Sequence, residues 1–178
     1  YGVTRHHVLG VEAVLATGEV VRFGGKYVKA STGYDLAQLI MGSEGTLAIV
    51  TEATLKLQPR RSHASTILAP FSTLDQVAHA VPHVVSSGLD PLIVEYIDLL
   101  TMSAIQTQFD LPLGIPDSIR EDALAYLVIV LESNDEDRLE SDVAVLAELL
   151  GDLGALDVYV LPAKAAQDLI AAREKAFF

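Results

Sequence analysis

Two side chains in the second half of the sequence are candidates for carboxylate chemistry: Arg173 could bind a carboxylate, and Glu95 is itself a carboxylate in an apolar setting. Arg173 stands in a helical pattern among Ala and Ile residues, and a guanidinium matches a planar carboxylate with two parallel hydrogen bonds. Glu95 stands inside an apolar run of strand type, where a buried carboxylate would need a partner. The alternatives are a surface Arg near the end of a helix, and an outward-facing Glu followed by Asp98 as a helix N-cap.

The first half of the sequence offers a glycine-rich stretch made of Gly42, Ser43, Glu44, Gly45 and Thr46. Glycine permits positive φ and lets a ligand come close to backbone N–H groups. The same residues would also serve as a helix C-cap and a tight turn. Neither the G-x-G-x-x-G pattern nor the Walker A pattern occurs, so a Rossmann or P-loop nucleotide site is unsupported.

Metal and thiol chemistry have little support in the sequence. The chain has no Cys, so disulfides, thiolate catalysis and Cys-ligated metal or iron–sulfur sites are excluded. His79 and His83 stand four apart in a helical pattern, the spacing of half a metal site. No third ligand accompanies them, and a solvent-facing pair is the other interpretation. We predict no metal site within these residues.

The composition limits the classes of partner. A net charge of −12 argues against a nucleic-acid partner. Apolar residues make up 51% of the chain and Trp is absent, so we expect a core of Leu, Ile, Val and Ala. The longest apolar runs are strand-sized, far below the roughly 20 residues of a membrane span, and no signal peptide opens the chain. A cytoplasmic protein without a membrane span is expected.

The elements that would carry the glycine-rich stretch begin with a β-hairpin that turns at Thr17 and Gly18. Asp35 is the expected N-cap of a short helix. Residues 59–62 combine Pro59 with charged residues, which predicts a domain boundary after residue 58. The predicted elements are strands at residues 8–15, 19–23 and 47–57 and a helix at residues 36–41.

Residues 63–178 predict four strands that alternate with helices. Such an order is typical of a parallel doubly wound sheet, or of a ferredoxin-like α+β sheet covered by helices on one face, and periodicity alone does not separate the two. Residues 111–122 contain two Pro and one Gly and predict a loop. The predicted strands are residues 63–70, 91–97, 125–132 and 156–161, and the predicted helices are residues 74–85, 99–109, 135–150 and 163–178.

Several short segments, taken in order, form a more specific pattern than any one of them alone. They are YGVTR (1–5), VLGVE (8–12), TGEVVRFG (17–24), Lys29, GYDL (33–36), GSEGTLAIVTEA (42–53), the stretch 71–98 ending in VEYID, and AREKAF (172–177). These segments resemble the FAD-linked oxidase family of the vanillyl-alcohol-oxidase type, with the glycolate oxidase flavin subunit and D-lactate dehydrogenases as close relatives. Their order and spacing agree with the family over the first 57 residues or so, and the agreement continues more weakly to the end.

The resemblance implies an α+β chain that is truncated at both ends. Residues 1–58 would be the C-terminal part of a PCMH-type FAD-binding domain, and residues 59–178 the start of a ferredoxin-like substrate cap domain with an antiparallel sheet. Arg173 would hold the substrate carboxylate, as a related Arg does in the family. The residues implied to contact FAD are Tyr1, Gly2, Gly42, Ser43, Glu44, Gly45, Thr46 and Ile49.

The reaction implied is the oxidation of a 2-hydroxy acid, of the glycolate or D-lactate type, to the 2-oxo acid by hydride transfer to FAD. The small hydroxy acid is the expected partner, with other subunits of an oxidase complex as further candidates, and the electron acceptor stays open. The alternatives are a non-catalytic flavin-domain subunit or binding module, and an enzyme of the family acting on another alcohol. Arg173 weighs against the last.

One departure from the family pattern, and family segments that lie outside this chain, limit what the resemblance implies for the site. Ala48 stands where the family usually has Gly, which narrows the room beside the cofactor. The resemblance also places the Gly-rich pyrophosphate loop and an Asn-Ala-Gly-Gly segment before Tyr1, and a His-x-Gly-Asp-Gly-Asn-Leu-His segment with active-site or metal-ligand His residues after Phe178. We therefore expect the chain by itself to be inactive.

Overall fold

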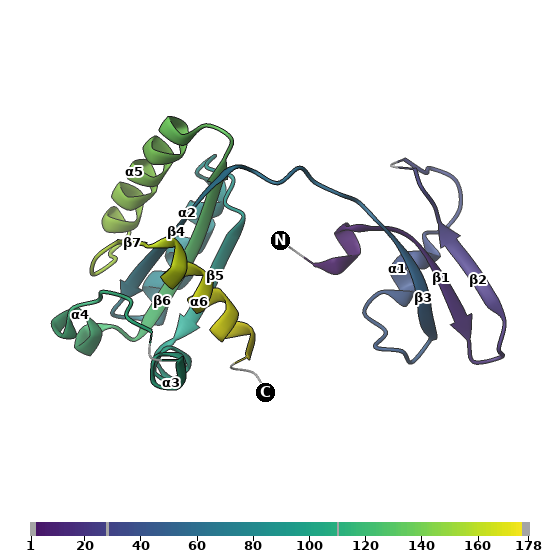
Figure 1. Cartoon of the computed structure of the whole chain (residues 1–178), viewed down its shortest axis with the longest axis horizontal. Helices are drawn as coiled ribbons and strands as arrows, with labels where there is room; N and C mark the ends of the chain where they lie inside the picture. The colour runs from purple at the N-terminus through teal and green to yellow at the C-terminus, as the bar shows by residue number, and fades with distance from the viewer. Residues whose placement is uncertain (1–2, 28, 110, 176–178) are drawn as a thin grey trace. The chain divides into compact units, whose positions relative to one another are not determined.

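The computed structural model describes residues 3–27, 29–109 and 111–175 (Figure 1). The chain divides into two compact units, Tyr1–Arg60 and Arg61–Phe178. The division falls within the boundary segment at residues 59–62. Each unit has its own sheet and its own core.

Unit 1 is built on a three-stranded antiparallel sheet with the strand order β2-β1-β3. The β1–β2 hairpin turns at Gly18, whose φ of 85° suits glycine, so the predicted hairpin is confirmed. Asp35 caps α1 as predicted, because its Oδ1 accepts a hydrogen bond from the N–H of Gln38 at 3.3 Å. The elements are η1 (Thr4–His6), β1 (Val8–Leu15), β2 (Val20–Gly24), α1 (Leu36–Ile40) and β3 (Ala48–Leu55).

The core of unit 1 is small, and much of β3 is not part of it. Ile49 is 63% exposed and Leu57, just after the strand, is 87% exposed. Most apolar positions of the third strand are not buried within the unit. The strand runs from Ala48 to Leu55 and is shorter than the predicted range of residues 47–57. The buried apolar residues are Val8, Val11, Ala13, Ala37, Ile40 and Ala48.

Unit 2 is an α+β domain with a four-stranded sheet in the order β5-β6-β4-β7. Every described strand pair in it is antiparallel. The first and third strands of the unit lie at the centre and the second and fourth at the edges, which is the ferredoxin-like arrangement. The antiparallel α+β prediction is confirmed, and the parallel doubly wound alternative is excluded. The strands are β4 (His63–Phe71), β5 (Ile93–Asp98), β6 (Ala125–Ser133) and β7 (Tyr159–Leu161).

Helices cover both faces of this sheet rather than one (Figure 1). On one face, α2 and α5 pack around Ile67 and Phe71; on the other, α3 and α6 pack around Leu68 and Tyr126. Consecutive residues of β4 and β6 are buried, and a strand that is buried on both faces needs a covering layer on each. The helices are α2 (Leu74–Ser86), α3 (Leu99–Phe109), α4 (Asp117–Asp122), α5 (Glu136–Asp152) and α6 (Ala163–Lys175).

In unit 2, α4 was not predicted and β7 is shorter than its predicted range. α4 lies inside the predicted loop at residues 111–122. Pro116 precedes it as N-cap, where the missing N–H of Pro costs no helical hydrogen bond. β7 is three residues long instead of six, because the side chain of Asp157 accepts a hydrogen bond from the next N–H at 2.8 Å and the ladder with β4 is limited to Thr66–Leu68.

Candidate functional site

The predicted cofactor loop, residues 42–46, joins the end of α1 to the start of β3. Three of its residues have positive φ: Gly42 at 90°, Glu44 at 50° and Gly45 at 80°. The two glycines adopt this conformation without steric cost, whereas Glu44 does so at a cost in backbone energy. Strain of this kind in a non-glycine residue is a recurrent feature of ligand sites.

The loop presents backbone donors. The N–H of Ser43 donates to the carbonyl of Ile40 at 3.0 Å, and the N–H of Thr46 donates to the carbonyl of Ser43 at 2.9 Å. Across residues 3–27, 29–109 and 111–175, no backbone acceptor pairs with the N–H groups of Glu44 and Gly45. Neighbouring N–H groups in such a turn suit an anionic or polar oxygen. The loop therefore fits a cofactor that carries oxygen acceptors.

Arg5 supports this loop, a role that the sequence analysis missed. Its Nη2 donates to the carbonyl of Met41 at 3.1 Å, and its own carbonyl accepts a hydrogen bond from Nε2 of Gln38 at 3.2 Å. A cation at this place satisfies a carbonyl left free at the end of α1. Arg5 and Met41 are 36 positions apart, so no local pattern in the sequence could have linked them.

The remaining predicted cofactor residues are placed in part. Ile49 is largely exposed on β3, and a Cβ atom at Gly45 would lie 3.7 Å from its Cδ1. Ala48, which departs from the family's Gly, is buried in a cluster with Ala13 and Ile40, so its methyl group packs into the core of unit 1. Tyr1 and Gly2 lie outside the described residues.

In unit 2 the two candidates for carboxylate chemistry come together. Arg173 on α6 forms an ion pair with Glu95 on β5, from Nη1 to Oε2. The side chains are 28% and 27% exposed, respectively. Arg173 is therefore not an exposed Arg at the end of a helix, and Glu95 is not a fully outward-facing strand residue. The partner that a buried Glu95 was expected to need is Arg173. Asp98 does act as an N-cap, since its Oδ1 accepts a hydrogen bond from the N–H of Thr101 at 2.7 Å.

Glu95 belongs to the sheet face that α6 covers. Side chains alternate along a strand, so Glu95 shares a face with Ile97, which is buried in the cluster that contains Leu169 and Ala172 of α6. Val94 packs into the cluster on the opposite face. The carboxylate thus lies at the margin of an apolar layer and meets the guanidinium from the helix above.

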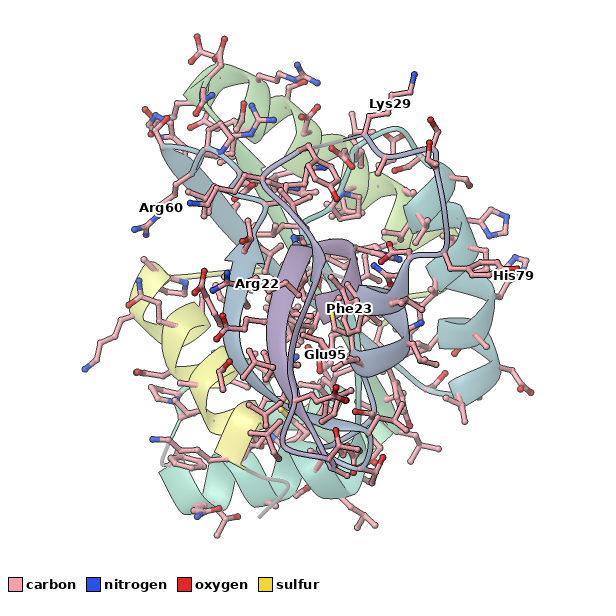
Figure 2. The ribbon with its side chains drawn as sticks, turned by 90° about the vertical axis from the view of Figure 1, so that its right-hand side faces the viewer. Arg22, Phe23, Lys29, Arg60, His79 and Glu95 are labelled. Carbon is pink, nitrogen blue, oxygen red and sulfur yellow. The ribbon has the colours of Figure 1, made fainter. Side chains whose placement is uncertain are left out.

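His79 and His83 lie one turn apart on α2 with their rings side by side. His79 lies on the surface of α2 (Figure 2), and its carbonyl is 2.8 Å from Nδ1 of His83, one turn on. In the part of the chain that the structure describes, no three metal-ligating side chains gather into a group that could hold an ion. Nor does any helix there have the length and apolarity to cross a membrane. The predicted cofactor loop at residues 42–46 lies in unit 1, and the Glu95–Arg173 pair lies in unit 2.

Comparison with known proteins identifies a family for residues 60–178 and relatives of the whole chain. A family model described as "FAD linked oxidases, C-terminal domain" matches residues 60–178. The chain is 55% identical over its full length to an uncharacterised FAD-linked oxidoreductase of Mycobacterium tuberculosis, of which it spans 39%. It is 42% identical over 67% of its length to the glycolate oxidase subunit GlcD of Bacillus subtilis, covering 25% of that protein.

One further relative matches in sequence, and one solved structure matches in fold. A D-lactate dehydrogenase of Archaeoglobus fulgidus is 35% identical over 94% of this chain and 35% of its own length. The structure of p-cresol methylhydroxylase with substrate bound matches with a TM-score of 0.66 over 88% of this chain and 34% of that one. At 18% sequence identity, the second likeness concerns the fold alone.

The class of protein is now defined: the chain is related to FAD-linked oxidoreductases. More particularly, it belongs to the FAD-linked oxidase family, whose C-terminal domain model matches residues 60–178. FAD is therefore its cofactor. The chain spans between 25% and 39% of the length of the three relatives described above.

Proposed function

We propose that the protein to which this chain belongs oxidises a 2-hydroxy acid, of the glycolate or D-lactate type, to the 2-oxo acid. The support is twofold. Relatives named glycolate oxidase subunit and D-lactate dehydrogenase match 67% and 94% of the chain, respectively. The observation that carries the proposal is the position of Arg173, a half-buried guanidinium that is held over the sheet by Glu95. We take Arg173 as the counterpart of the carboxylate-binding Arg that the family resemblance implies.

Arg173 would bind the substrate through its carboxylate. The ion pair with Glu95 uses Nη1, and a guanidinium has five N–H donors in a planar fork. The edge formed by Nε and Nη2 can therefore donate to a second carboxylate while the pair with Glu95 persists. Two parallel hydrogen bonds would fix the orientation of a small hydroxy acid, and with it the direction of its α-carbon.

Bound FAD would supply the two-electron oxidant for this reaction, in which the α-carbon loses a hydride to the flavin and the hydroxyl proton is released to solvent. The loop at residues 42–46 would hold the cofactor through the N–H groups of Glu44 and Gly45, with Ser43, Thr46 and Ile49 beside them. Arg5 would keep the loop in place through its bond to Met41. Tyr1 and Gly2 complete the proposed set.

The partners follow from the same proposal. A small hydroxy acid is the substrate, and a separate electron acceptor reoxidises the flavin. Because the B. subtilis relative is named a subunit, other subunits of an oxidase complex are proposed as well. The net charge of −12 continues to argue against a nucleic-acid partner, and a cytoplasmic location stays a prediction.

The proposal is tested with the full-length, FAD-containing protein and the variants Arg173→Ala and Arg173→Lys. A charge-assisted hydrogen bond contributes on the order of 1.5–3 kcal/mol, so loss of the guanidinium should lower kcat/KM for D-lactate or glycolate by about tenfold to a hundredfold. Lys keeps the charge but lacks the planar fork, and should not restore the rate. The matched control is Arg138→Ala, which removes an exposed Arg paired with Asp142 on α5.

Two outcomes would contradict the proposal. Wild-type kcat/KM in both Arg173 variants would make Arg173 a structural residue and remove the basis for a carboxylate substrate. An equal loss of rate toward an alcohol without a carboxylate would point to a different substrate class. The flavin spectrum of the substrate-free protein should be unchanged in all variants, because Arg173 lies in unit 2 and the proposed cofactor loop lies in unit 1.

A further inference from the structure

Glu95 is an unusual residue for its place in the sheet. It lies on β5 between Ile93 and Ile97, which belong to the same strand face, and Ile97 is 3% exposed. Its cross-strand neighbour on β6 is Val128, which is also buried. A carboxylate in such a setting loses hydration, and this cost must be offset by a partner.

The partner is anchored differently from Glu95. β5 is paired with β6 along its whole length, from Ile93 to Asp98, so the backbone under Glu95 is fixed. Arg173 stands in the last turn of α6, where its long side chain would otherwise have many rotamers. The ion pair therefore restricts the guanidinium to one place over the sheet, and the rigid member of the pair is Glu95.

We propose that Glu95 is a positioning residue for Arg173, and so for the carboxylate of the substrate. The proposal rests on the proposed function of Arg173 as the carboxylate-binding residue. The carboxylate of Glu95 holds the Nη1 side of the guanidinium and leaves the Nε–Nη2 edge directed away from the pair. Glu95 does not itself touch the substrate.

The charges of the pair allow orientation of Arg173 by Glu95 to be distinguished from electrostatic attraction of the substrate. Glu95 and Arg173 together carry no net charge, so a substrate carboxylate meets a neutral pair whose donors are already oriented. Removing the negative charge of Glu95 leaves Arg173 with an uncompensated positive charge, which attracts a carboxylate at least as well. Only the orientation is lost. A variant without the carboxylate should therefore bind substrate but turn it over slowly.

The experiment is a double-mutant cycle in the full-length flavoprotein with Glu95→Gln, Arg173→Ala and the combined variant. We expect Glu95→Gln to lower kcat for D-lactate or glycolate by about tenfold to a hundredfold, since misplacement of a reacting group by about 1 Å has effects of this size. KM should stay within about threefold. In the Arg173→Ala background, Glu95→Gln should cause no further loss beyond about twofold, because residues that act as a unit are not additive.

A binding readout that needs no turnover accompanies the kinetics. Oxalate, a carboxylate that this reaction cannot oxidise, is titrated while the flavin absorption spectrum is followed. Glu95→Gln should bind oxalate at least as tightly as the wild type, whereas Arg173→Ala should lose most of the spectral change. The matched control is Glu132→Gln, which removes a half-buried carboxylate from β6 and should leave kcat and oxalate binding unchanged.

The outcomes separate the two proposals. If Arg173→Ala lowers kcat/KM but Glu95→Gln has wild-type kcat, the positioning role is wrong and the proposed function stands. If the effects of the two substitutions multiply in the combined variant, Glu95 acts independently of Arg173 and the inference is overturned. Wild-type kinetics in Arg173→Ala would overturn the proposed function itself. Should Glu95→Gln not fold, Glu95→Asp, which keeps the charge on a shorter side chain, undergoes the same cycle, and wild-type kcat in it contradicts the inference.

Discussion

Replacing Gly45 by Ala tests whether this glycine contacts the cofactor or is needed only because its backbone has positive φ. Gly45 and Gly18 both lie in unit 1 and have nearly equal φ values, 80° and 85°. A Cβ atom at Gly18 would meet nothing within 4 Å, and one at Gly45 would lie 3.7 Å from Cδ1 of Ile49, an ordinary contact. Within the protein alone, each substitution should therefore cost about the same, roughly 1–2 kcal/mol for a left-handed residue with a side chain.

The bound cofactor is expected to make the difference. If FAD lies against residues 42–46, a methyl group at Gly45 takes space that the ligand needs, and overpacking of this kind costs about 1–3 kcal/mol. The Kd for FAD should rise by roughly 5-fold to 150-fold in Gly45→Ala. Gly18→Ala should leave it within about twofold. Gly45→Val adds a β-branched side chain at positive φ and should lower both FAD affinity and stability further.

The assay is FAD titration of the deflavinated full-length protein, followed by flavin fluorescence, with denaturant unfolding measured on the same samples. The account predicts equal losses of stability in Gly45→Ala and Gly18→Ala but a weaker Kd only in Gly45→Ala. Wild-type FAD affinity in Gly45→Ala would refute the reasoning, because Gly45 would then be only a turn residue.

Three further predictions test other parts of the structure. Hydrogen bonds from Thr51 and Arg22 hold the pKa of Glu12 below its usual range. Glu12 therefore stabilises the folded state above pH 4.5, and this contribution is lost as the pH falls through the lowered pKa. In denaturant unfolding, Glu12→Gln should be less stable than the wild type at pH 7 and equal to it in acid. The hydroxyl of Tyr126 is buried without a hydrogen-bond partner among the described residues. Tyr126→Phe should therefore raise the free energy of unfolding by about 1 kcal/mol. A lower free energy of unfolding in this variant would mean that the hydroxyl has a partner such as water. Burial also raises the pKa of Tyr126 above 10, so wild-type stability should fall as the pH rises above 10 more than that of Tyr126→Phe, and parallel pH profiles would contradict this.

The periodic parts of the fold could be predicted because their signals are local. Asp35 marks the start of α1, and alternating strand and helix patterns mark most elements of unit 2. The antiparallel order of the sheet was not contained in those patterns, since both parallel and antiparallel sheets fit them, and it entered through the family resemblance. α4 was missed because Pro116 was interpreted as part of a loop, although Pro is well suited to the start of a helix.

The site was predicted in pieces. Glu95 was recognised as a carboxylate that needs a partner, and Arg173 as a guanidinium suited to a carboxylate. Their pairing could not be derived, because they are 78 positions apart in the sequence and only the packing of α6 on the sheet brings them together. Arg5 was missed for the same reason, since its contact with Met41 depends on how α1 packs.

The central claim is tested most directly by anaerobic mixing of the full-length flavoprotein with matched pairs of compounds. Glycolate and D-lactate are compared with ethylene glycol and propane-1,2-diol, which keep the hydroxyl group and replace the carboxylate. The account predicts that the flavin absorbance bleaches with at least one hydroxy acid and not with its diol, and that Arg173→Ala slows the bleaching. A flavin that stays oxidised with both hydroxy acids, or that is reduced equally by the diols, would contradict the account.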